Sequence, residues 1–272
     1  MFAEVESVPQ GQTKRFRIEK GRVRGKRFVT QVGLSGLYET FRLDHSYIDV
    51  KTAAKGGAVT IDFERMLDGA ENLSELIDVL TEGLVDSTYL EVQKALRAAY
   101  DNAGRPDANK HTSAGFEPEE MVKLVNIVRS YGNGAVIFAP PEFIAAMGPD
   151  AIVPVGGNIP GVYHPQDIDA IHNQGYINIF RGTPVVQIPQ SFVDENNDTT
   201  WIDPQMAYIL PTGKEKIVKV ALEGETQIND FKNKDNSMEM HFYRKEGCAI
   251  ATHHNWCIYK NSQIPDTLDK SL

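Results

Sequence analysis

The chain has 272 residues, of which 41 % are hydrophobic and 24 % are charged, as in an ordinary soluble globular protein. This length is sufficient for two modest domains or one elaborate domain. No run of about 18 apolar residues is present, so no transmembrane helix is expected. The N-terminal stretch MFAEVESVPQ lacks the charged and apolar regions of a secretory signal.

The net charge of −9 conceals a strongly basic segment near the N-terminus. Residues 11–30 contain eight basic side chains and one acid, a balance of +7, which leaves −16 on the rest of the chain. Such a segment binds either an external polyanion or the acidic surface of another copy of the same protein. Its basic residues are Lys14, Arg15, Arg17, Lys20, Arg22, Arg24, Lys26 and Arg27.

Residues 12–49 carry the pattern of a long β-hairpin. The stretch RFRI (15–18) alternates basic and apolar residues, and LYETFRLDHSYIDV (37–50) is rich in aromatic and β-branched residues. A hairpin with few large aliphatic side chains is marginally stable in water. We therefore expect this basic hairpin, about residues 10–50, to lie against another surface.

Residues 71–101 predict a long helix. Their apolar side chains recur at steps of three and four, and Asn102, Gly104 and Pro106 end the pattern. At 1.5 Å per residue this helix spans roughly 45 Å, and we expect Gly83 to permit a bend in its middle. A long core helix and a coiled-coil segment both fit, although the seam is not strict enough for a sustained coiled coil.

Residues 116–192 predict an α/β module, reached through a polar linker at 104–115. Within this module the sequence alternates short helical and extended segments. An acidic polar loop follows at 193–205. Helices are expected at 117–134, 141–148 and 164–175, and strands at 135–140 and within 176–192.

From residue 206 onward the sequence predicts β structure almost throughout. The stretch MAYILPTGKEKIVKVALEGETQINDF (206–231) shows a Pro-Thr-Gly turn, an apolar strand, a Gly-Glu turn and a second strand. None of its residues looks like a nucleophile or a metal ligand, so we interpret it as part of a structural wall that packs against the long helix. The expected strands are Ala207–Leu210, Ile217–Leu222, Thr226–Phe231, Met238–Arg244, Ala249–His253 and Trp256–Tyr259.

Cys248, His253, His254 and Cys257 form the only group that invites a metal or nucleophile interpretation. Structural zinc sites favour C-x₂₋₄-C and H-x₃₋₅-H spacings, whereas these cysteines are nine apart and the histidines are adjacent. Adjacent side chains on a strand point to opposite faces, so both histidines do not easily reach one ion. Free thiols in a reducing cytoplasm and a polar hairpin turn are the simpler interpretation. We assign no catalytic, cofactor-binding or metal-binding residue.

The basic segment leaves two interpretations open. Direct nucleic-acid binding is weakly supported, because Phe16 and Phe28 are the aromatic side chains interleaved with the basic ones. Contact with another subunit is favoured, since a long hairpin needs a partner surface and the rest of the chain supplies an acidic one. The side chains expected in that inter-subunit contact are Lys14, Arg15, Arg17, Arg22, Arg24, Lys26 and Arg27.

Several stretches resemble, in the family's order, the major capsid proteins of tailed bacteriophages with the HK97-type fold. They are AVTIDFERMLDGAENLSELIDVLTEGLVDSTYLEVQKALRAAYD (58–101), RGTPVVQIPQSF (181–192) and the C-terminal segment from AYILPTGKEKIVKV to HHNWCIYKNS (207–262). The resemblance covers about residues 1–262 and depends on the order of these stretches, because no single short motif is diagnostic.

The resemblance implies an α+β, HK97-like capsid fold. Residues 1–61 correspond to an N-terminal segment and the E-loop hairpin, which reaches across a neighbouring subunit. Residues 62–109 correspond to the spine helix of the P (peripheral) domain with its linker, and 110–200 to the α/β A (axial) domain. Residues 201–272 correspond to the strands that complete the P domain and to a tail. Family members usually carry an N-terminal arm before the E-loop, whereas this sequence begins almost at the hairpin.

The resemblance also implies a structural function and no enzymatic activity. The chain is expected to assemble into pentamers and hexamers of an icosahedral head that encloses double-stranded DNA without sequence-specific binding. Implied partners are other copies of the chain, a scaffolding protein, a portal and a decoration protein, with no membrane and no cofactor. The implied location is the virion, after assembly in the cytoplasm of the bacterial host.

Other functions remain as alternatives at this point. An encapsulin-type nanocompartment shell has the same fold and is distinguished by an enclosed cargo enzyme in place of DNA. A soluble metalloprotein or enzyme that uses the Cys248–Cys257 region predicts stoichiometric zinc. A DNA-binding protein predicts tight binding by the isolated subunit with a steep salt dependence.

Overall fold

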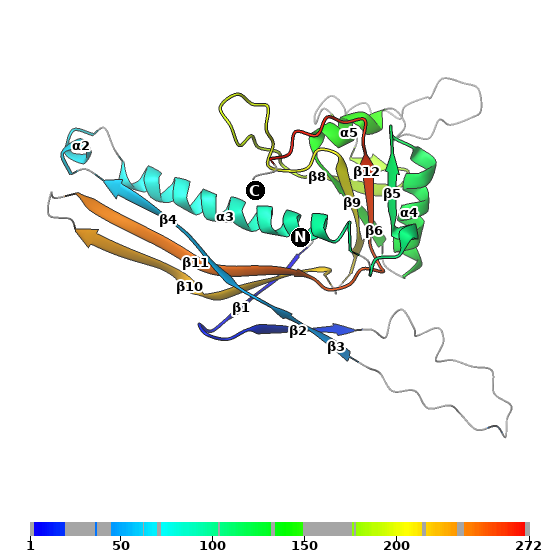
Figure 1. Ribbon diagram of the computed structural model, residues 1–272, viewed down its shortest axis with the longest axis horizontal. Helices are drawn as coiled ribbons and strands as arrows, with labels where there is room; N and C mark the ends of the chain where they lie inside the picture. Colours follow the sequence, from blue (N-terminus) through cyan, green and yellow to red (C-terminus); the bar gives the residue numbers. More distant parts are fainter. Residues whose placement is uncertain are drawn as a thin grey trace. The chain divides into compact units, whose positions relative to one another are not determined.

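The computed structural model describes residues 3–19, 36, 45–61, 63–69, 72–102, 104–131, 134–148, 176, 178–213, 216–232 and 237–269. The chain divides into two compact units, Ala3–Leu96 with Ile217–Ala251 and Arg97–Lys216 with Thr252–Leu272. Both contain helices and strands, which confirms the predicted α+β class (Figure 1). None of the described helices combines the length and apolar character that crossing a bilayer requires.

A four-stranded sheet forms the body of the first unit (Figure 1). Its strand order is β1–β10–β11–β4, in which β1 runs parallel to β10 and the other neighbours are antiparallel. The long strands β10 and β11 form its central ribbon. The bounds are β1 Ala3–Val8, β4 Ala53–Ile61, β10 Val218–Lys232 and β11 Met238–Ile250.

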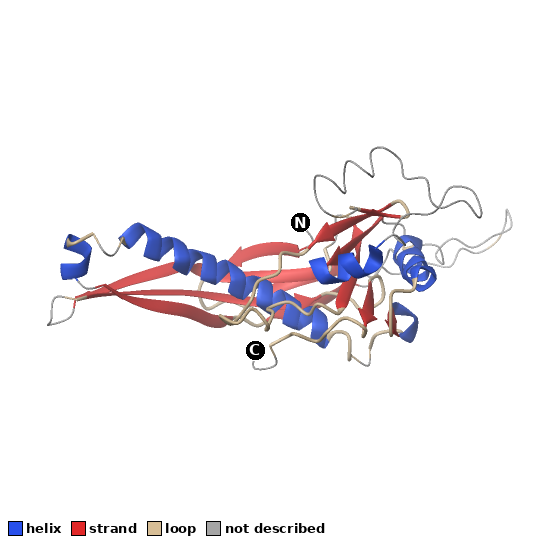
Figure 2. Ribbon diagram, turned by 90° about the horizontal axis from the view of Figure 1, so that it is seen from above, coloured by secondary structure: helices blue, strands red, loops and turns tan. Residues whose placement is uncertain are grey.

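The long helix α3 (Leu73–Ala98) runs along this sheet and confirms the helix predicted at 71–101 (Figure 2). Its start is capped, because the Asn72 Oδ1 accepts a hydrogen bond from the Ser74 N–H at 3.1 Å. The helix continues unbroken through Gly83, which lies in open space. A short helix, α2 (Phe63–Leu67), precedes it.

The root of the basic hairpin consists of two antiparallel strands, β2 (Lys14–Glu19) and β3 (His45–Val50). Their pairing confirms the hairpin predicted from the sequence at its two ends. Phe16 and Val50 form a small buried cluster with Ala221 of β10, which supplies the surface that such a hairpin needs. Most of the hairpin beyond the root lies outside the described residues.

Two predictions for the first unit are wrong, and two of its strands were not predicted. The expected Gly-Glu turn is no reversal: β10 continues through Gly224, whose φ of 71° is accommodated by a register shift between Glu223 and Gln227. The two strands expected at 238–244 and 249–253 are a single strand, β11. The unpredicted strands are β1 and β4, which pair with β10 and β11 respectively.

A six-stranded sheet forms the second unit, in the order β5–β12–β9–β6–β8–β7. The helices α4 and α5 confirm the predictions at 117–134 and 141–148. Pro118 and Pro141 each stand at a helix start, where the missing N–H costs nothing. The bounds are β5 Lys110–Ser113, α4 Pro118–Ser130, β6 Gly134–Ala139, α5 Pro141–Met147, β7 Ile179–Phe180, β8 Thr183–Gln187, β9 Met206–Thr212 and β12 Cys257–Asn261.

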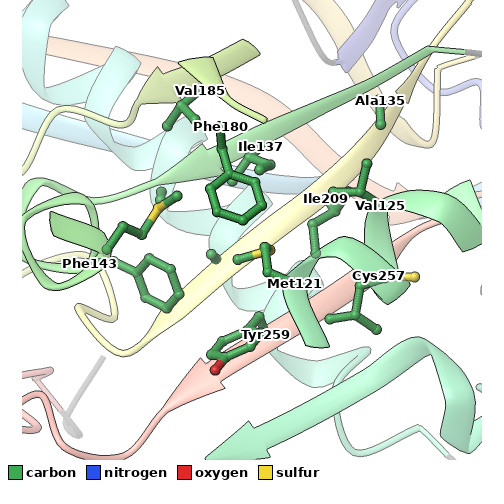
Figure 3. Packing of buried hydrophobic residues seen from close by; sticks show 14 of the residues in the cluster. Met121, Val125, Ala135, Ile137, Phe143, Phe180, Val185, Ile209, Cys257 and Tyr259 are labelled. Atoms are coloured by element: carbon green, nitrogen blue, oxygen red, sulfur yellow. The ribbon is translucent and has the colours of Figure 1, made fainter. Parts of the chain in front are cut away.

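The core of the second unit lies between its helices and its sheet (Figure 3). One face of α4 is buried there through residues spaced three and four apart. The phenol of Tyr259 crosses this core: its hydroxyl accepts the Glu117 N–H at 2.7 Å and lies 2.7 Å from the Ser113 hydroxyl. Phe143 packs edge-on against the Tyr259 ring at 5.7 Å. The buried residues of α4 are Met121, Leu124, Val125 and Val128.

The linker predicted at 104–115 is wrong in part, because it contains a 3₁₀ turn at Asp107–Asn109 and the strand β5, which pairs with β12 in parallel. The helix predicted at 164–175 lies outside the described residues. Residues 201–272 divide between the two units, with Ile217–Ala251 in the first and the remainder in the second. The four named domains of the sequence analysis remain a prediction.

Candidate assembly surfaces

The described members of the predicted basic set lie on β2. The Arg15 Nε and Nη2 donate to the Asp49 carboxylate at 2.7 and 3.0 Å, straight across the hairpin root. Lys14 pairs with Glu6 of β1, and Arg17 also has an interaction within the chain. The remaining members, Arg22, Arg24, Lys26 and Arg27, lie outside the described residues.

The Arg15–Asp49 pair is open to water, with side chains 64 % and 50 % exposed. An exposed pair of this kind contributes little to stability, because water screens the attraction. Arg15 can therefore exchange Asp49 for a carboxylate of another molecule at little cost. The mutual hydrogen bonds still lower the pKa of Asp49 and raise that of Arg15, so both groups stay charged near neutral pH.

The outer face of α3 carries a line of exposed carboxylates. They recur at steps of three, four and four, which places them on one side of the helix. None forms an ion pair with another described residue, and exposed apolar side chains lie between them. The carboxylates are Glu75, Asp78, Glu82 and Asp86, and the apolar residues are Val79, Val85 and Tyr89.

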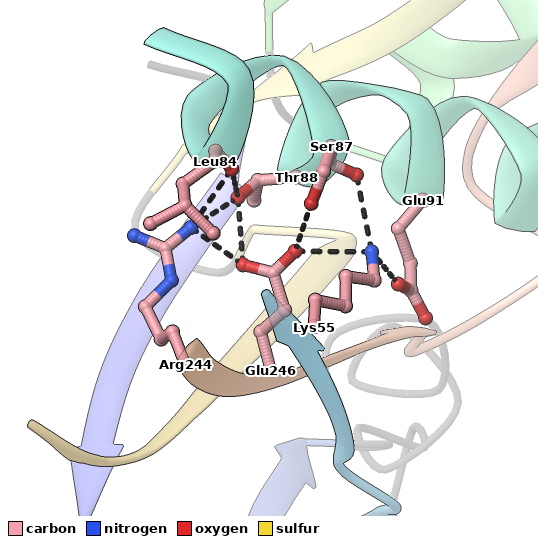
Figure 4. A network of polar contacts seen from close by, with 7 residues as sticks. All are labelled: Lys55, Leu84, Ser87, Thr88, Glu91, Arg244 and Glu246. Carbon is pink, nitrogen blue, oxygen red and sulfur yellow. Dashed lines mark hydrogen bonds and ion pairs between the residues drawn. The ribbon is translucent and has the colours of Figure 1, made fainter. Parts of the chain in front are cut away.

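The inner face of α3 is joined to the sheet by a buried polar network (Figure 4). Glu246 of β11, only 1 % exposed, lies at its centre. Its Oε1 accepts from the Ser87 hydroxyl and the Lys55 Nζ, each at 3.0 Å. Its Oε2 accepts from the Thr88 hydroxyl and the Arg244 Nη2, each at 2.7 Å.

Two cations of this network also bind the helix directly. The Arg244 Nη2 donates to the Leu84 carbonyl at 3.0 Å. The Lys55 Nζ donates to the Ser87 carbonyl at 3.1 Å and pairs with Glu91. Burial alone would raise the pKa of Glu246, but the hydrogen bonds from Thr88, Lys55 and Arg244 outweigh burial and lower it. The carboxylate is therefore ionised and holds α3 against β4 and β11.

The C-terminal cysteine and histidine residues show no metal site. Among the described residues, no three His, Cys, Asp or Glu side chains are placed to hold a metal ion. Cys248 belongs to the first unit, whereas His253, His254 and Cys257 belong to the second. Burial raises the pKa of both thiols to about 12, so neither supplies a thiolate nucleophile near neutral pH.

A groove in the second unit has a volume of about 630 Å³. It is lined by α5, by the loop after β8 and by the segment after β12. Its titratable lining residues are Glu142 and Asp198, with exposed Phe192 beside them, and no histidine, cysteine or lysine is among the lining residues.

The buried network was not predicted, although the sequence carries two signals of it. Arg244 ends the strand predicted at 238–244 and Glu246 lies two residues beyond it, so the two side chains share one face if that strand continues. On α3 the core-facing pattern is interrupted by Ser87, Thr88 and Glu91, polar residues that occupy inward positions. Polar side chains at the inward positions of both elements indicate a polar contact between them.

Comparison with known proteins gives one family and a set of solved structures. The family described as "SPbeta prophage-derived putative capsid protein YonB" matches residues 1–258. A comparison with curated proteins finds no match.

The solved structures share the fold at low sequence identity. The capsid of cyanophage P-SCSP1u has a TM-score of 0.64 at 8 % identity, covering 96 % of this chain and 86 % of that chain. The mature capsid of bacteriophage PhiM1 has a TM-score of 0.60 at 10 % identity, covering 97 % and 86 %. The SrpI encapsulin of Synechococcus elongatus PCC 7942 has 0.58 at 13 %, covering 96 % and 86 %. These likenesses confirm the predicted HK97-like capsid fold.

Proposed function

The chain belongs to the YonB family of prophage capsid proteins and is a structural capsid protein, and we propose that it assembles into pentamers and hexamers of an icosahedral head around double-stranded DNA. The observation that carries the proposal is the family match over residues 1–258, nearly the whole chain. In a closed shell each subunit meets neighbours on every side, so contacts that are weak singly sum to a stable assembly.

The basic hairpin supplies one of these contacts. Residues 11–30 carry +7 and the rest of the chain −16, so the hairpin of one copy is attracted to the body of the next. At the root, Arg15 is exposed and held by a pair that exchanges easily. The hairpin thus serves as a cationic element that reaches a neighbouring subunit.

The carboxylate face of α3 is the receptor that fits this hairpin. Alternate side chains of an extended chain repeat at about 6.6 Å, and four-residue steps along a helix repeat at about 6 Å. Arg22, Arg24 and Lys26 alternate along the sequence, while Asp78, Glu82 and Asp86 step by four along α3. With the extended conformation that the sequence pattern predicts for the basic segment, the similar repeats allow several ion pairs to form in register.

The double variant Arg15→Glu/Arg17→Glu tests this contact. We expect it to fold with a melting temperature close to that of the native subunit, because the affected side chains lie on the hairpin. We also expect it to form no normal shells, since the attraction at two positions becomes repulsion. Electron microscopy and size-exclusion chromatography measure the assembly, and normal shells would overturn the electrostatic role of the hairpin.

The swap Arg15→Glu/Asp49→Arg is the matched control for a purely internal role. It restores the ion pair across the hairpin root and leaves the net charge unchanged. If Arg15 serves only the hairpin, the swap assembles normally. If Arg15 contacts a neighbouring copy, the swap remains impaired.

An encapsulin-type shell is the second candidate, favoured by the likeness to the SrpI encapsulin. The content of purified particles separates the two: packaged DNA supports the phage head, and an enclosed enzyme without DNA supports the nanocompartment. A DNA-binding function of the isolated subunit predicts tight binding that weakens steeply with salt, whereas a mainly acidic capsid subunit binds little. Stoichiometric zinc in purified protein would support a metalloprotein.

A capsid protein is a component of the virion, and its principal partner is another copy of itself. We assign a scaffolding protein, a portal and a decoration protein as further partners, and the bacterial cytoplasm as the place of assembly. The support for these assignments is the capsid family to which the chain belongs.

A further inference from the structure

Glu223 lies where β10 shifts its register against β11. Its side chain is 8 % exposed and accepts three hydrogen bonds. The Oε1 accepts from the Gly11 N–H at 2.8 Å and from the Lys245 Nζ at 3.1 Å. The Oε2 accepts from the Thr52 hydroxyl.

Two of these donors belong to opposite ends of the basic hairpin. Gly11 precedes β2, and Thr52 follows β3 and precedes β4. A hairpin held at one end can swing about that end, whereas one held at both ends has a defined direction. Glu223 therefore ties the entry and the exit of the hairpin to a single point on the sheet.

A close backbone approach at the same place adds to this anchorage. The chain between β3 and β4 passes so near Gly247 of β11 that a Cβ there would lie 2.1 Å from the Lys51 carbonyl oxygen. No side chain fits into that space. Beside it, Phe16 and Val50 pack on Ala221. The hairpin root is thus seated on the sheet by apolar contact, by a glycine and by one carboxylate.

We propose that Glu223 is a positioning residue that fixes the direction in which the basic hairpin leaves the subunit, and thereby sets the geometry of its contact with the next copy. The part that concerns the next copy rests on the function proposed above. The part that concerns the root does not, since it follows from contacts within the subunit.

The protonation of Glu223 is consistent with a permanent anchor. Hydrogen bonds from Thr52, Gly11 and Lys245 lower its pKa to about 2. A carboxyl whose pKa is lowered by folding contributes stability that is present above its unfolded pKa, about 4.3, and that is lost as the pH falls through the folded pKa. The anchor therefore persists through mildly acidic conditions.

The test compares Glu223→Gln with Glu225→Gln, an exposed position two residues further along the same strand. Hydrogen exchange is measured in the unassembled native-length chain at Gly11 and along β2 and β3. Because glutamine keeps one acceptor and loses the charge, we expect exchange there to accelerate about tenfold or more in Glu223→Gln. We expect no change in Glu225→Gln.

Electron microscopy of the same proteins then shows whether the contact between copies has the correct geometry for a closed shell. We expect Glu223→Gln to give misshapen or incomplete shells, and Glu225→Gln to give normal ones. Unchanged exchange at the root, or a loosened root with normal shells, would overturn the proposal. If even the native chain forms no shells, the proposed function fails, while the exchange result still decides whether Glu223 anchors the root.

Two further variants keep the test decisive if Glu223→Gln does not fold. Thr52→Val removes one donor without changing the shape of the side chain and is expected to loosen the root in the same way. Gly247→Ala forces the chain at Lys51 away from β11, and Gly83→Ala on the open side of α3 is its matched control. Unchanged root exchange in both Thr52→Val and Gly247→Ala would overturn the proposal.

Discussion

Glu246 illustrates how a single buried charge joins two elements of this fold. A carboxylate that leaves water for the interior loses several kcal/mol of hydration unless it gains equivalent partners. Glu246 gains four donors, two of them cationic, and α3 supplies two hydroxyls for the remaining oxygen sites. These contacts come from two neighbouring turns of the helix and hold it against the sheet.

Removal of the Glu246 carboxylate is expected to be strongly destabilising. In Glu246→Ala the cations Lys55 and Arg244 lose their shared acceptor while both remain partly buried. Breaking a buried pair in this way costs about 3–5 kcal/mol, measured as the free energy of unfolding in urea. Glu225→Ala, at an exposed position, is the control and is expected to change stability by less than about 0.5 kcal/mol. A loss below about 1 kcal/mol for Glu246→Ala would show that the network contributes little.

The role of a single residue was predictable where the charged residues lie next to one another in the sequence. The basic set was evident because its members are neighbours in the chain, and the structure places Lys14 and Arg15 on the hairpin as expected. The roles of Glu223 and Glu246 were not predictable, because their hydrogen-bond donors include residues up to 212 positions away in the chain. No local pattern distinguishes these two glutamates from an exposed one such as Glu225.

The helix α3 has two faces with different tasks. Its inner face is fixed to β4 and β11, and its outer face presents carboxylates that have no ion pair among the described residues, beside exposed apolar side chains. Charge on the outer face is therefore unrelated to the packing of the helix. In a protein that must be stable as a subunit and also bind its neighbours, this division allows each face to change without the other.

Charge reversal of the outer face tests this division. We expect Asp78→Lys/Glu82→Lys to leave the free energy of unfolding within about 0.5 kcal/mol of the native value, while assembly is lost. Combination with Arg22→Glu/Arg24→Glu in the same chain restores attraction between copies, and we expect partial recovery of shells in that quadruple variant. No recovery would argue against a direct contact between the basic hairpin and α3.

Among the helices and strands, the sequence predicted those whose hydrophobic pattern is visible within a single segment. Both α3 and α4 repeat apolar residues at helical spacing over many positions. The strand β4, AAKGGAVTI, lacks such a pattern and has residues of low strand propensity. Its composition follows from its position: a Cβ at Gly57 would lie 3.1 Å from the Leu80 side chain of α3. The small residues of β4 let α3 lie close to the strand. The pattern of one segment does not reveal such a contact between two segments.

The whole chain is acidic apart from one basic segment, and this asymmetry favours association with identical copies. Attraction between the basic segment and the acidic remainder of another copy is screened beyond about 8–10 Å at physiological ionic strength, so it acts only at contact. Many weak, exposed pairs of this kind suit a shell, because they can be remade during assembly and become significant through repetition. The fold could be recognised from the order of several stretches along the chain, whereas the anchorage of the hairpin required the three-dimensional structure.

The most direct test of the central claim is negative-stain electron microscopy, with light scattering, of the native chain expressed alone and concentrated. The account predicts closed shells, or rings of five and six subunits. A protein that remains a clean monomer at every concentration would contradict self-assembly as the function of this chain.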